Sequence, residues 1–182
     1  IHALISSVDA LNSDGAPLLE MSSSESAPLG SIFKLYVLLA LSDAIKNGEL
    51  TWEDELTVSD EVRSLPSGEL QNEPTGTVVT VREAATKMIE ISDNTATDMI
   101  IQRLGREAIE AAVVASGHHD PEAMSPFPST RELFQVEWGN PEYLERWKSG
   151  TSEERRALLD EISRRPFTTE DITIGNDALW TE

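Results

Sequence analysis

One helical segment constrains the fold of this chain more than any other stretch. From Ser31 to Asn47, apolar residues occupy most of the helix circumference and not one stripe, which predicts a central, buried helix. These residues are Phe33, Leu35, Tyr36, Leu38, Leu39, Leu41 and Ile45. Gly48 stands where a left-handed residue would end the helix. Lys34 lies inside the apolar run, where an exposed lysine face is hard to find.

Turn and capping signals predict the remaining elements. Apolar segments at Ile1–Ala10 and Pro17–Met21 flank a polar turn, so we expect a β-hairpin with a long connection. Residues 51–79 carry Pro and Gly turn markers and are expected to be rich in loops. Further helices are expected at Thr80–Ile91, Asp93–Leu104, Arg106–Ala115, from Ser129 onward, at Pro141–Lys148 and at Ser152–Arg165.

Composition narrows the classes of function. The 182 residues include 14 basic and 33 acidic side chains, and the net charge of −19 disfavours binding to a phosphate backbone. No apolar run approaches the roughly 20 residues that a membrane-spanning helix needs. The chain contains no cysteine, which excludes a thiolate nucleophile and cysteine-ligated metal. We expect no metal or organic cofactor. The adjacent His118, His119 and Asp120 are interpreted as a solvated loop and not as a metal site.

The strongest chemical signal is Ser31-Ile32-Phe33-Lys34, at the start of the buried helix. Residues three apart share one helical face, so the amine of Lys34 can reach the hydroxyl of Ser31. A lysine enclosed by apolar residues loses part of its preference for the charged form and can activate a serine nucleophile. The alternative is a helix-capping serine followed by a solvated lysine.

A second signal is Ser92-Asp93-Asn94, on a turn between two expected helices. A hydroxyl and an amide held on a short turn can relay a proton and hydrogen-bond a substrate amide. The alternative interpretation is local, with Ser92 or Asp93 serving only as the N-cap of the next helix.

Together the two motifs, 61 residues apart, resemble those of the penicillin-recognising serine hydrolases, most closely the class A β-lactamases. The resemblance implies that Ser31 is acylated, that Lys34 activates it and that Ser92 moves a proton to the leaving nitrogen. It further implies that Asn94 binds the substrate carbonyl and helps to fix Lys34, and that the backbone N–H of Ser31 forms half of the oxyanion hole. Ser67, between the motifs, is expected at the rim of the site as a substrate-binding residue.

Two further motifs of class A enzymes are not found at their expected places. The Glu-x-x-Leu-Asn motif, whose glutamate activates the deacylating water, would lie near Pro128, where the nearest acid is Glu132. Glu132 is therefore the candidate deacylation base, although its position in a capping box is an alternative explanation. The Lys-Ser/Thr-Gly motif is matched in letters by Lys148-Ser149-Gly150, which we interpret as the end of a helix.

The resemblance implies a two-lobe α/β (α+β) fold of the β-lactamase/transpeptidase type, with a helical lobe and an antiparallel sheet. We expect residues 1–30 to contribute strands to the α/β lobe and residues 31–182 to form the helical lobe. The C-terminal strands of the family would begin beyond Glu182, so we expect the chain to be the amino-terminal portion of a longer protein.

The predicted function is a serine hydrolase that forms an acyl-enzyme at Ser31 and acts on a β-lactam or a related amide or ester. One alternative is a peptidase or esterase on the same scaffold, favoured by the missing Glu-x-x-Leu-Asn motif. Another is a non-catalytic ligand-binding or interaction domain. The expected partner is a small-molecule substrate, and the resemblance implies an extracytoplasmic location.

Overall fold

The computed structural model describes residues 3–5, 19–21 and 29–165. The chain divides into two compact units, and within the described residues the boundary falls between Gly30 and Ser31. Both serine motifs lie in the second unit. The assignment of residues 1–30 to an α/β lobe and of 31–182 to a helical lobe stays a prediction.

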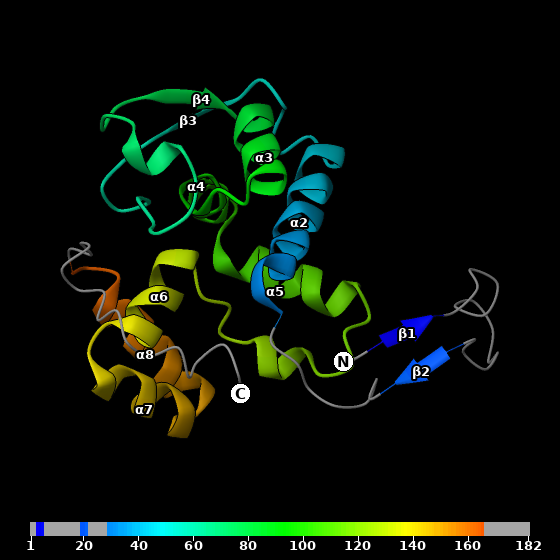
Figure 1. The fold of residues 1–182 in the computed structure, drawn as a ribbon. Helices are drawn as coiled ribbons and strands as arrows, with labels where there is room; N and C mark the ends of the chain where they lie inside the picture. The colour runs from blue at the N-terminus through cyan, green and yellow to red at the C-terminus, as the bar shows by residue number, and fades with distance from the viewer. Residues whose placement is uncertain (1–2, 6–18, 22–28, 166–182) are drawn as a thin grey trace. The chain divides into compact units, whose positions relative to one another are not determined.

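The described part of the first unit is a short antiparallel pair of strands (Figure 1). Strand β1 (Ala3–Ile5) pairs with β2 (Leu19–Met21), with Leu4 opposite Glu20. The predicted hairpin is thus present as paired strands, and its connection lies outside the described residues.

The second unit is built around α2 (Lys34–Lys46), which contacts α3, α4 and α5. A 3₁₀ turn, η1 (Gly30–Phe33), precedes α2, so the predicted helix begins with a tighter turn than expected. Val37, Ala40 and Leu41 are buried, but Ile32 and Leu35 are 63% and 54% exposed. The prediction of a helix buried on nearly every side is therefore wrong for the face that carries these two residues.

Three helices pack around α2: α3 (Val81–Glu90), α4 (Asn94–Leu104) and α5 (Arg106–Ala115). The Oγ1 atom of Thr80 accepts a hydrogen bond from the Glu83 N–H, and the Asp93 carboxylate accepts one from the Ala96 N–H. These side chains satisfy backbone donors that a helix start leaves unpaired. The predicted helix starts are confirmed within one residue.

A second antiparallel pair, β3 (Glu55–Thr57) and β4 (Val78–Thr80), was not expected from the sequence. Each strand has only three residues, and only the middle ones, Leu56 and Val79, are buried. Three residues are too few for an alternating pattern to stand out from a loop. The short 3₁₀ helix η2 (Leu70–Asn72) lies between these strands in the sequence.

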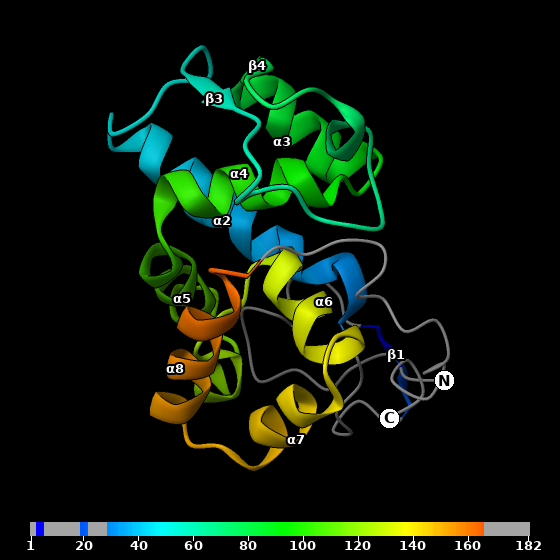
Figure 2. The same ribbon diagram turned by 90° about the vertical axis from the view of Figure 1, so that its left-hand side faces the viewer.

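The remaining elements form a second core. After the 3₁₀ helix η3 (Pro121–Met124) come α6 (Thr130–Trp138), α7 (Pro141–Ser149) and α8 (Ser152–Ile162), which lie side by side (Figure 2). Their shared apolar cluster consists of Val136, Tyr143, Leu158, Leu159 and Ile162. No helix in the described ranges is long and apolar enough to cross a membrane.

Candidate active site

Ser31 and Lys34 stand at the junction of η1 and α2. A 3₁₀ turn places residues three apart directly above one another, so the two side chains share one face. Ser31 is exposed, whereas Lys34 is only 2% exposed and opens the helix that carries the core. A hydroxyl open to solvent therefore stands beside a lysine that is buried.

The turn between α3 and α4 brings the second motif to the same place. Ser92 adopts a left-handed conformation with φ of 59°, which is uncommon for a residue that has a Cβ atom. The peptide N–H of Asp93 donates to the carbonyl oxygen of Lys87 at 3.1 Å. The backbone thus turns sharply and directs both the hydroxyl and the carbonyl of Ser92 at Lys34.

The Nζ atom of Lys34 donates three hydrogen bonds. Its acceptors are the Ser92 carbonyl at 2.7 Å, the Ser92 Oγ at 2.8 Å and the Asn94 Oδ1 at 2.8 Å. An ammonium group has three protons, so each one has its own acceptor. The two motifs are therefore joined through Lys34.

Ser92 continues this network to Ser31. The Oγ atoms of Ser92 and Ser31 lie 2.8 Å apart, and because Lys34 already donates to Ser92, the Ser92 hydroxyl donates to Ser31. Within the described residues no hydrogen bond joins Lys34 directly to Ser31. The connection between Lys34 and Ser31 therefore runs through Ser92.

Burial lowers the pKa of Lys34 to about 8, from an ordinary value of 10.5. Loss of hydration is the largest cause, and the negative charges of Asp98 and Asp93 oppose it. At a pH between 7 and 8, an appreciable fraction of Lys34 is a free amine that can accept a proton. This meets the requirement for a general base near neutral pH.

Asn94 is held from three directions. Its Oδ1 accepts from Lys34, its Nδ2 donates to the Leu65 carbonyl at 3.3 Å, and its backbone N–H donates to the Ser67 carbonyl at 2.9 Å. The side chain is 4% exposed. Asn94 is thus fixed beside Lys34, while its contact with a substrate stays a prediction.

Ser67 lies on a loop tied to the Ser92 turn. The carboxylate of Asp93 accepts from the peptide N–H groups of Glu69 at 2.7 Å and Leu70 at 2.9 Å. Gly68, with φ of 117°, leaves room for this carboxylate, since a Cβ there would lie 2.3 Å from the Asp93 Cγ. The structure therefore places Ser67 beside Asn94, and its role in binding substrate stays a prediction.

A family model described as "Beta-lactamase enzyme family" matches residues 6–165 of this sequence. The chain belongs to the β-lactamase enzyme family. This assignment confirms the resemblance to the penicillin-recognising serine hydrolases that the two serine motifs predicted. Among curated proteins no match is found.

Solved structures agree with this β-lactamase assignment. PBP-A is 26% identical with a TM-score of 0.53 over 82% of this chain and 58% of that chain. A substituted PBP-A, in an acyl-enzyme complex with penicillin G, is 28% identical with a TM-score of 0.52 over the same shares of 82% and 58%. A β-lactamase from Sphaerobacter thermophilus DSM 20745 is 20% identical with a TM-score of 0.55, over 82% and 59%.

The fold expected from the sequence, largely helical with a small antiparallel sheet, is therefore confirmed as β-lactamase-like. The chain spans less than two thirds of the length of these structures. The activity of a whole β-lactamase-family protein is accordingly treated below as a proposal.

Within the described residues, Glu132 makes no hydrogen bond to Ser31, Lys34, Ser92 or Asn94. Its carboxylate contacts the Arg106 guanidinium at 2.9 and 3.1 Å and accepts from the Ser129 N–H at 2.7 Å. The capping box expected from Ser129 to Glu132 is confirmed. A role for Glu132 in deacylation stays a prediction.

Two other sequence features lie outside the network. Lys148-Ser149-Gly150 spans the end of α7, where Ser149 Oγ donates to the Glu145 carbonyl, as expected for a helix end. His118 stacks on His119, and the described residues hold no group of three or more side chains suited to a metal.

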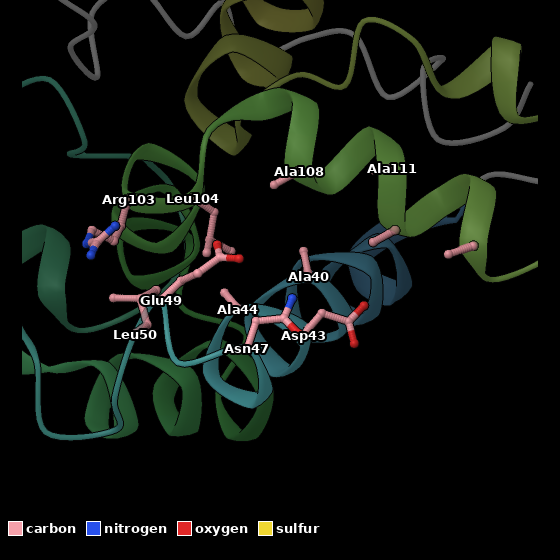
Figure 3. A pocket seen from close by; sticks show the side chains of 12 residues that line it. Ala40, Asp43, Ala44, Asn47, Glu49, Leu50, Arg103, Leu104, Ala108 and Ala111 are labelled. Atoms are coloured by element: carbon pink, nitrogen blue, oxygen red, sulfur yellow. The ribbon is translucent and has the colours of Figure 1, made fainter.

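A surface cavity of about 320 Å³ lies between α2 and α5, and alanines line much of it (Figure 3). None of the predicted site residues lines this cavity. We therefore locate the candidate site from the hydrogen-bond network and not from the cavity.

One buried residue near the site was missed by the sequence analysis. Asp98, on α4 one turn beyond Asn94, is 4% exposed, and burial raises its pKa to about 7. An available signal was its place between Thr97 and the apolar Met99 and Ile100, in the helix expected from Asp93 to Leu104.

Proposed function

We propose that this chain carries the nucleophile of a class A β-lactamase-like serine hydrolase, and that Ser31 is acylated by a β-lactam or a related amide or ester. The supporting observation is the continuous set of hydrogen bonds from Ser31 through Ser92 to Lys34 and Asn94. This arrangement gives an exposed hydroxyl a route to a buried amine with a lowered pKa.

In the proposed acylation, Ser31 Oγ forms a bond to the substrate carbonyl carbon while its proton passes to Ser92 and the Ser92 proton passes to the free amine of Lys34. Collapse of the tetrahedral intermediate breaks the carbon–nitrogen bond. The proton held by Lys34 returns through Ser92 to the leaving nitrogen. Protons balance, and the product is an ester at Ser31.

The developing oxyanion needs hydrogen-bond donors. The backbone N–H of Ser31, at the start of the helical segment, is the proposed first donor. Removing one donor of this kind typically costs about 3–4 kcal/mol in the barrier. The family resemblance assigns the second donor to the Lys-Ser/Thr-Gly strand, which the sequence analysis did not locate.

The rate of deacylation decides whether the protein hydrolyses a β-lactam repeatedly or stays covalently acylated by it. No Glu-x-x-Leu-Asn motif occurs near Pro128, and Glu132 is already engaged by Arg106 and Ser129. We therefore expect a long-lived acyl-enzyme and slow release. The same observation favours the second candidate, a peptidase or esterase on this scaffold.

Intact-mass spectrometry after incubation with penicillin G tests acylation. We expect a gain of one penicillin mass in the protein and none in Ser31→Ala. Ser42→Ala, which removes an exposed serine from α2, the helix that follows Ser31, is the matched control and should still be modified. Absence of an adduct with both penicillin G and a fluorophosphonate would contradict the proposed nucleophile.

Following the adduct over time separates the two candidates. Comparing rates with nitrocefin and with p-nitrophenyl esters shows which acyl group turns over. A persistent penicillin adduct together with rapid ester turnover would favour the peptidase or esterase.

The extracytoplasmic location implied by the family stays a prediction, which fractionation of the source cells would test.

A further inference from the structure

Asp98 ties the first turn of α6 to α4. Its Oδ1 accepts from the Thr130 N–H at 2.7 Å and from the Thr130 hydroxyl at 2.8 Å, and its Oδ2 accepts from the Arg131 N–H at 2.9 Å. These peptide donors belong to a helix start, where a carboxylate is favoured. Helices α4 and α6 contact each other in the second unit (Figure 2).

The Thr130 hydroxyl connects Asp98 to the active-site residue Asn94. Its Oγ1 lies 2.8 Å from the Ser64 Oγ, 3.1 Å from the Asn94 carbonyl oxygen and 2.8 Å from Asp98. A hydroxyl has a single proton. With Asp98 ionised, Thr130 donates to the carboxylate. With Asp98 protonated, the acid can donate to Thr130, and the Thr130 proton is free to turn to Asn94.

Asp98 lies one helical turn along α4 from Asn94, whose Oδ1 accepts from Lys34 Nζ, so a charge on Asp98 stands near the Lys34 ammonium group. Of the two carboxylates that raise the pKa of Lys34, Asp98 has the larger effect and Asp93 the smaller. Two charged groups on α6, Arg131 and Glu132, also act on Asp98. The Asp98 carboxylate attracts the Arg131 guanidinium group. The Glu132 carboxylate repels that of Asp98 and so raises the pKa of Asp98.

We propose that Asp98 is a positioning residue of the Ser31 site, which holds the start of α6 against α4 and, when ionised, retains the proton on Lys34. Ionised Asp98 stabilises the ammonium form of Lys34, and neutral Asp98 favours the free amine that acylation requires. Because the two charges attract each other and both groups titrate near neutral pH, the protonation of one affects that of the other. The kinetic consequence rests on the proposed function, whereas the effect on Lys34 does not.

The decisive variant is Asp98→Asn, which keeps the size of the side chain and an oxygen acceptor for Thr130, but removes the charge and the acceptor of the Arg131 N–H. The titration of Lys34 is followed by NMR in protein labelled with ¹³C-lysine. Its Cε signal is assigned as the one that disappears from the spectrum of Lys34→Arg. We expect the Lys34 titration midpoint to fall by about half a unit to one unit in Asp98→Asn. The pH profile for penicillin adduct formation should move to lower pH by the same amount.

Two further variants separate charge from position. Asp43→Asn removes a carboxylate from an exposed site on α2 and should move the Lys34 midpoint by less than about 0.2 units, because exposed charges are screened. Thr130→Val keeps the Asp98 charge but removes one hydrogen bond to it. We expect the Asp98 carboxyl titration, followed by ¹³C NMR, to move upward.

The outcomes distinguish this inference from the proposed function. A Lys34 midpoint in folded Asp98→Asn that is unchanged or higher would overturn the inference, whatever happens with penicillin. A protein that never forms an adduct would overturn the function and leave the Lys34 comparison intact. If Asp98→Asn does not fold, the wild-type Lys34 signal must show an inflection at the Asp98 midpoint, and its absence would refute the coupling.

Discussion

The amine of Lys34 reaches the hydroxyl of Ser31 through Ser92, with 2.8 Å between Lys34 Nζ and Ser92 Oγ and 2.8 Å between the two serine oxygens. The spacing of Ser31 and Lys34 in the sequence suggested a direct contact. The structure instead places the second motif between them. In the proposed mechanism, Ser92 is therefore the residue through which protons pass to and from Ser31.

Ser92→Ala should therefore slow acylation of Ser31 without removing the nucleophile. Losing a positioned proton-transfer group typically costs about 10²–10⁴-fold in rate. The rate of penicillin adduct formation, measured by quenched-flow mass spectrometry, gives this number directly. Ser42→Ala is the control on the same helix as Lys34 and should match the wild type. A Ser92→Ala rate within threefold of wild type would show that Lys34 acts on Ser31 without Ser92.

The left-handed backbone of Ser92 predicts an effect on stability that is separate from its chemistry. A residue with a Cβ atom pays roughly 1–2 kcal/mol to adopt this conformation, and glycine does not. Ser92→Gly should be more stable than Ser92→Ala by about 1 kcal/mol in the free energy of unfolding. Both variants lack the hydroxyl, so comparing their urea denaturation curves isolates the backbone term. Equal stability would mean that the turn carries no strain.

Some of the site could be predicted because its signals are local. Capping residues and the Ser31–Lys34 spacing depend on neighbours within one turn of helix, and the structure confirms most of the expected helix boundaries. The strands β3 and β4 were missed because three-residue strands leave almost no periodic signal.

Tertiary contacts were much harder to anticipate. Asp98 accepts hydrogen bonds from Thr130 and Arg131, which lie 32 and 33 positions further along the chain. Local sequence patterns do not encode pairs at such separations. The exposure of Ile32 in η1 and of Leu35 in α2 was missed for a related reason. An apolar pattern indicates which residues favour burial, but not which neighbours cover them.

Gly68→Ala should be strongly destabilising because of a specific collision. A Cβ at this position would lie 2.3–2.6 Å from the Asp93 carboxyl group, which is held by the Glu69 and Leu70 N–H groups. We expect a loss of about 2–4 kcal/mol in the free energy of unfolding. Gly76→Ala is the matched control, since Gly76 has φ of 96° but no atom within 4 Å of its Cβ position. Equal losses in both variants would rule out the collision and leave only backbone strain.

The buried Asp98 predicts how stability changes with pH. Burial raises its pKa from 3.8 to about 7, so the folded protein holds this proton more tightly than the unfolded chain does. Its stabilising contribution is fully present below about pH 4 and is lost as the pH rises to about 7. Lys34 titrates above this window. Asp98→Asn should therefore become more stable relative to wild type between pH 4.5 and 6.5, as measured by urea denaturation. A difference that is constant over this range would contradict the raised pKa.

Glu132 provides a test that separates a fold role from a catalytic one. Its carboxylate, 7% exposed, pairs with Arg106 and caps α6, so Glu132→Gln should cost about 1–3 kcal/mol in the free energy of unfolding. Because both carboxylate oxygens are already engaged, we expect the lifetime of the penicillin adduct to stay the same.

Arg106→Gln removes the partner of Glu132 in the ion pair and leaves the Glu132 carboxylate in place. In a double-mutant cycle with Glu132→Gln, the coupling energy reports the ion pair itself. If Glu132 instead activates the deacylating water, Glu132→Gln will lengthen the adduct lifetime by at least tenfold, and Arg106→Gln, which leaves the carboxylate in place, will not lengthen it to the same degree. A lengthened lifetime confined to Glu132→Gln would assign the deacylation base, whereas parallel losses of stability with unchanged lifetimes would assign Glu132 to the fold.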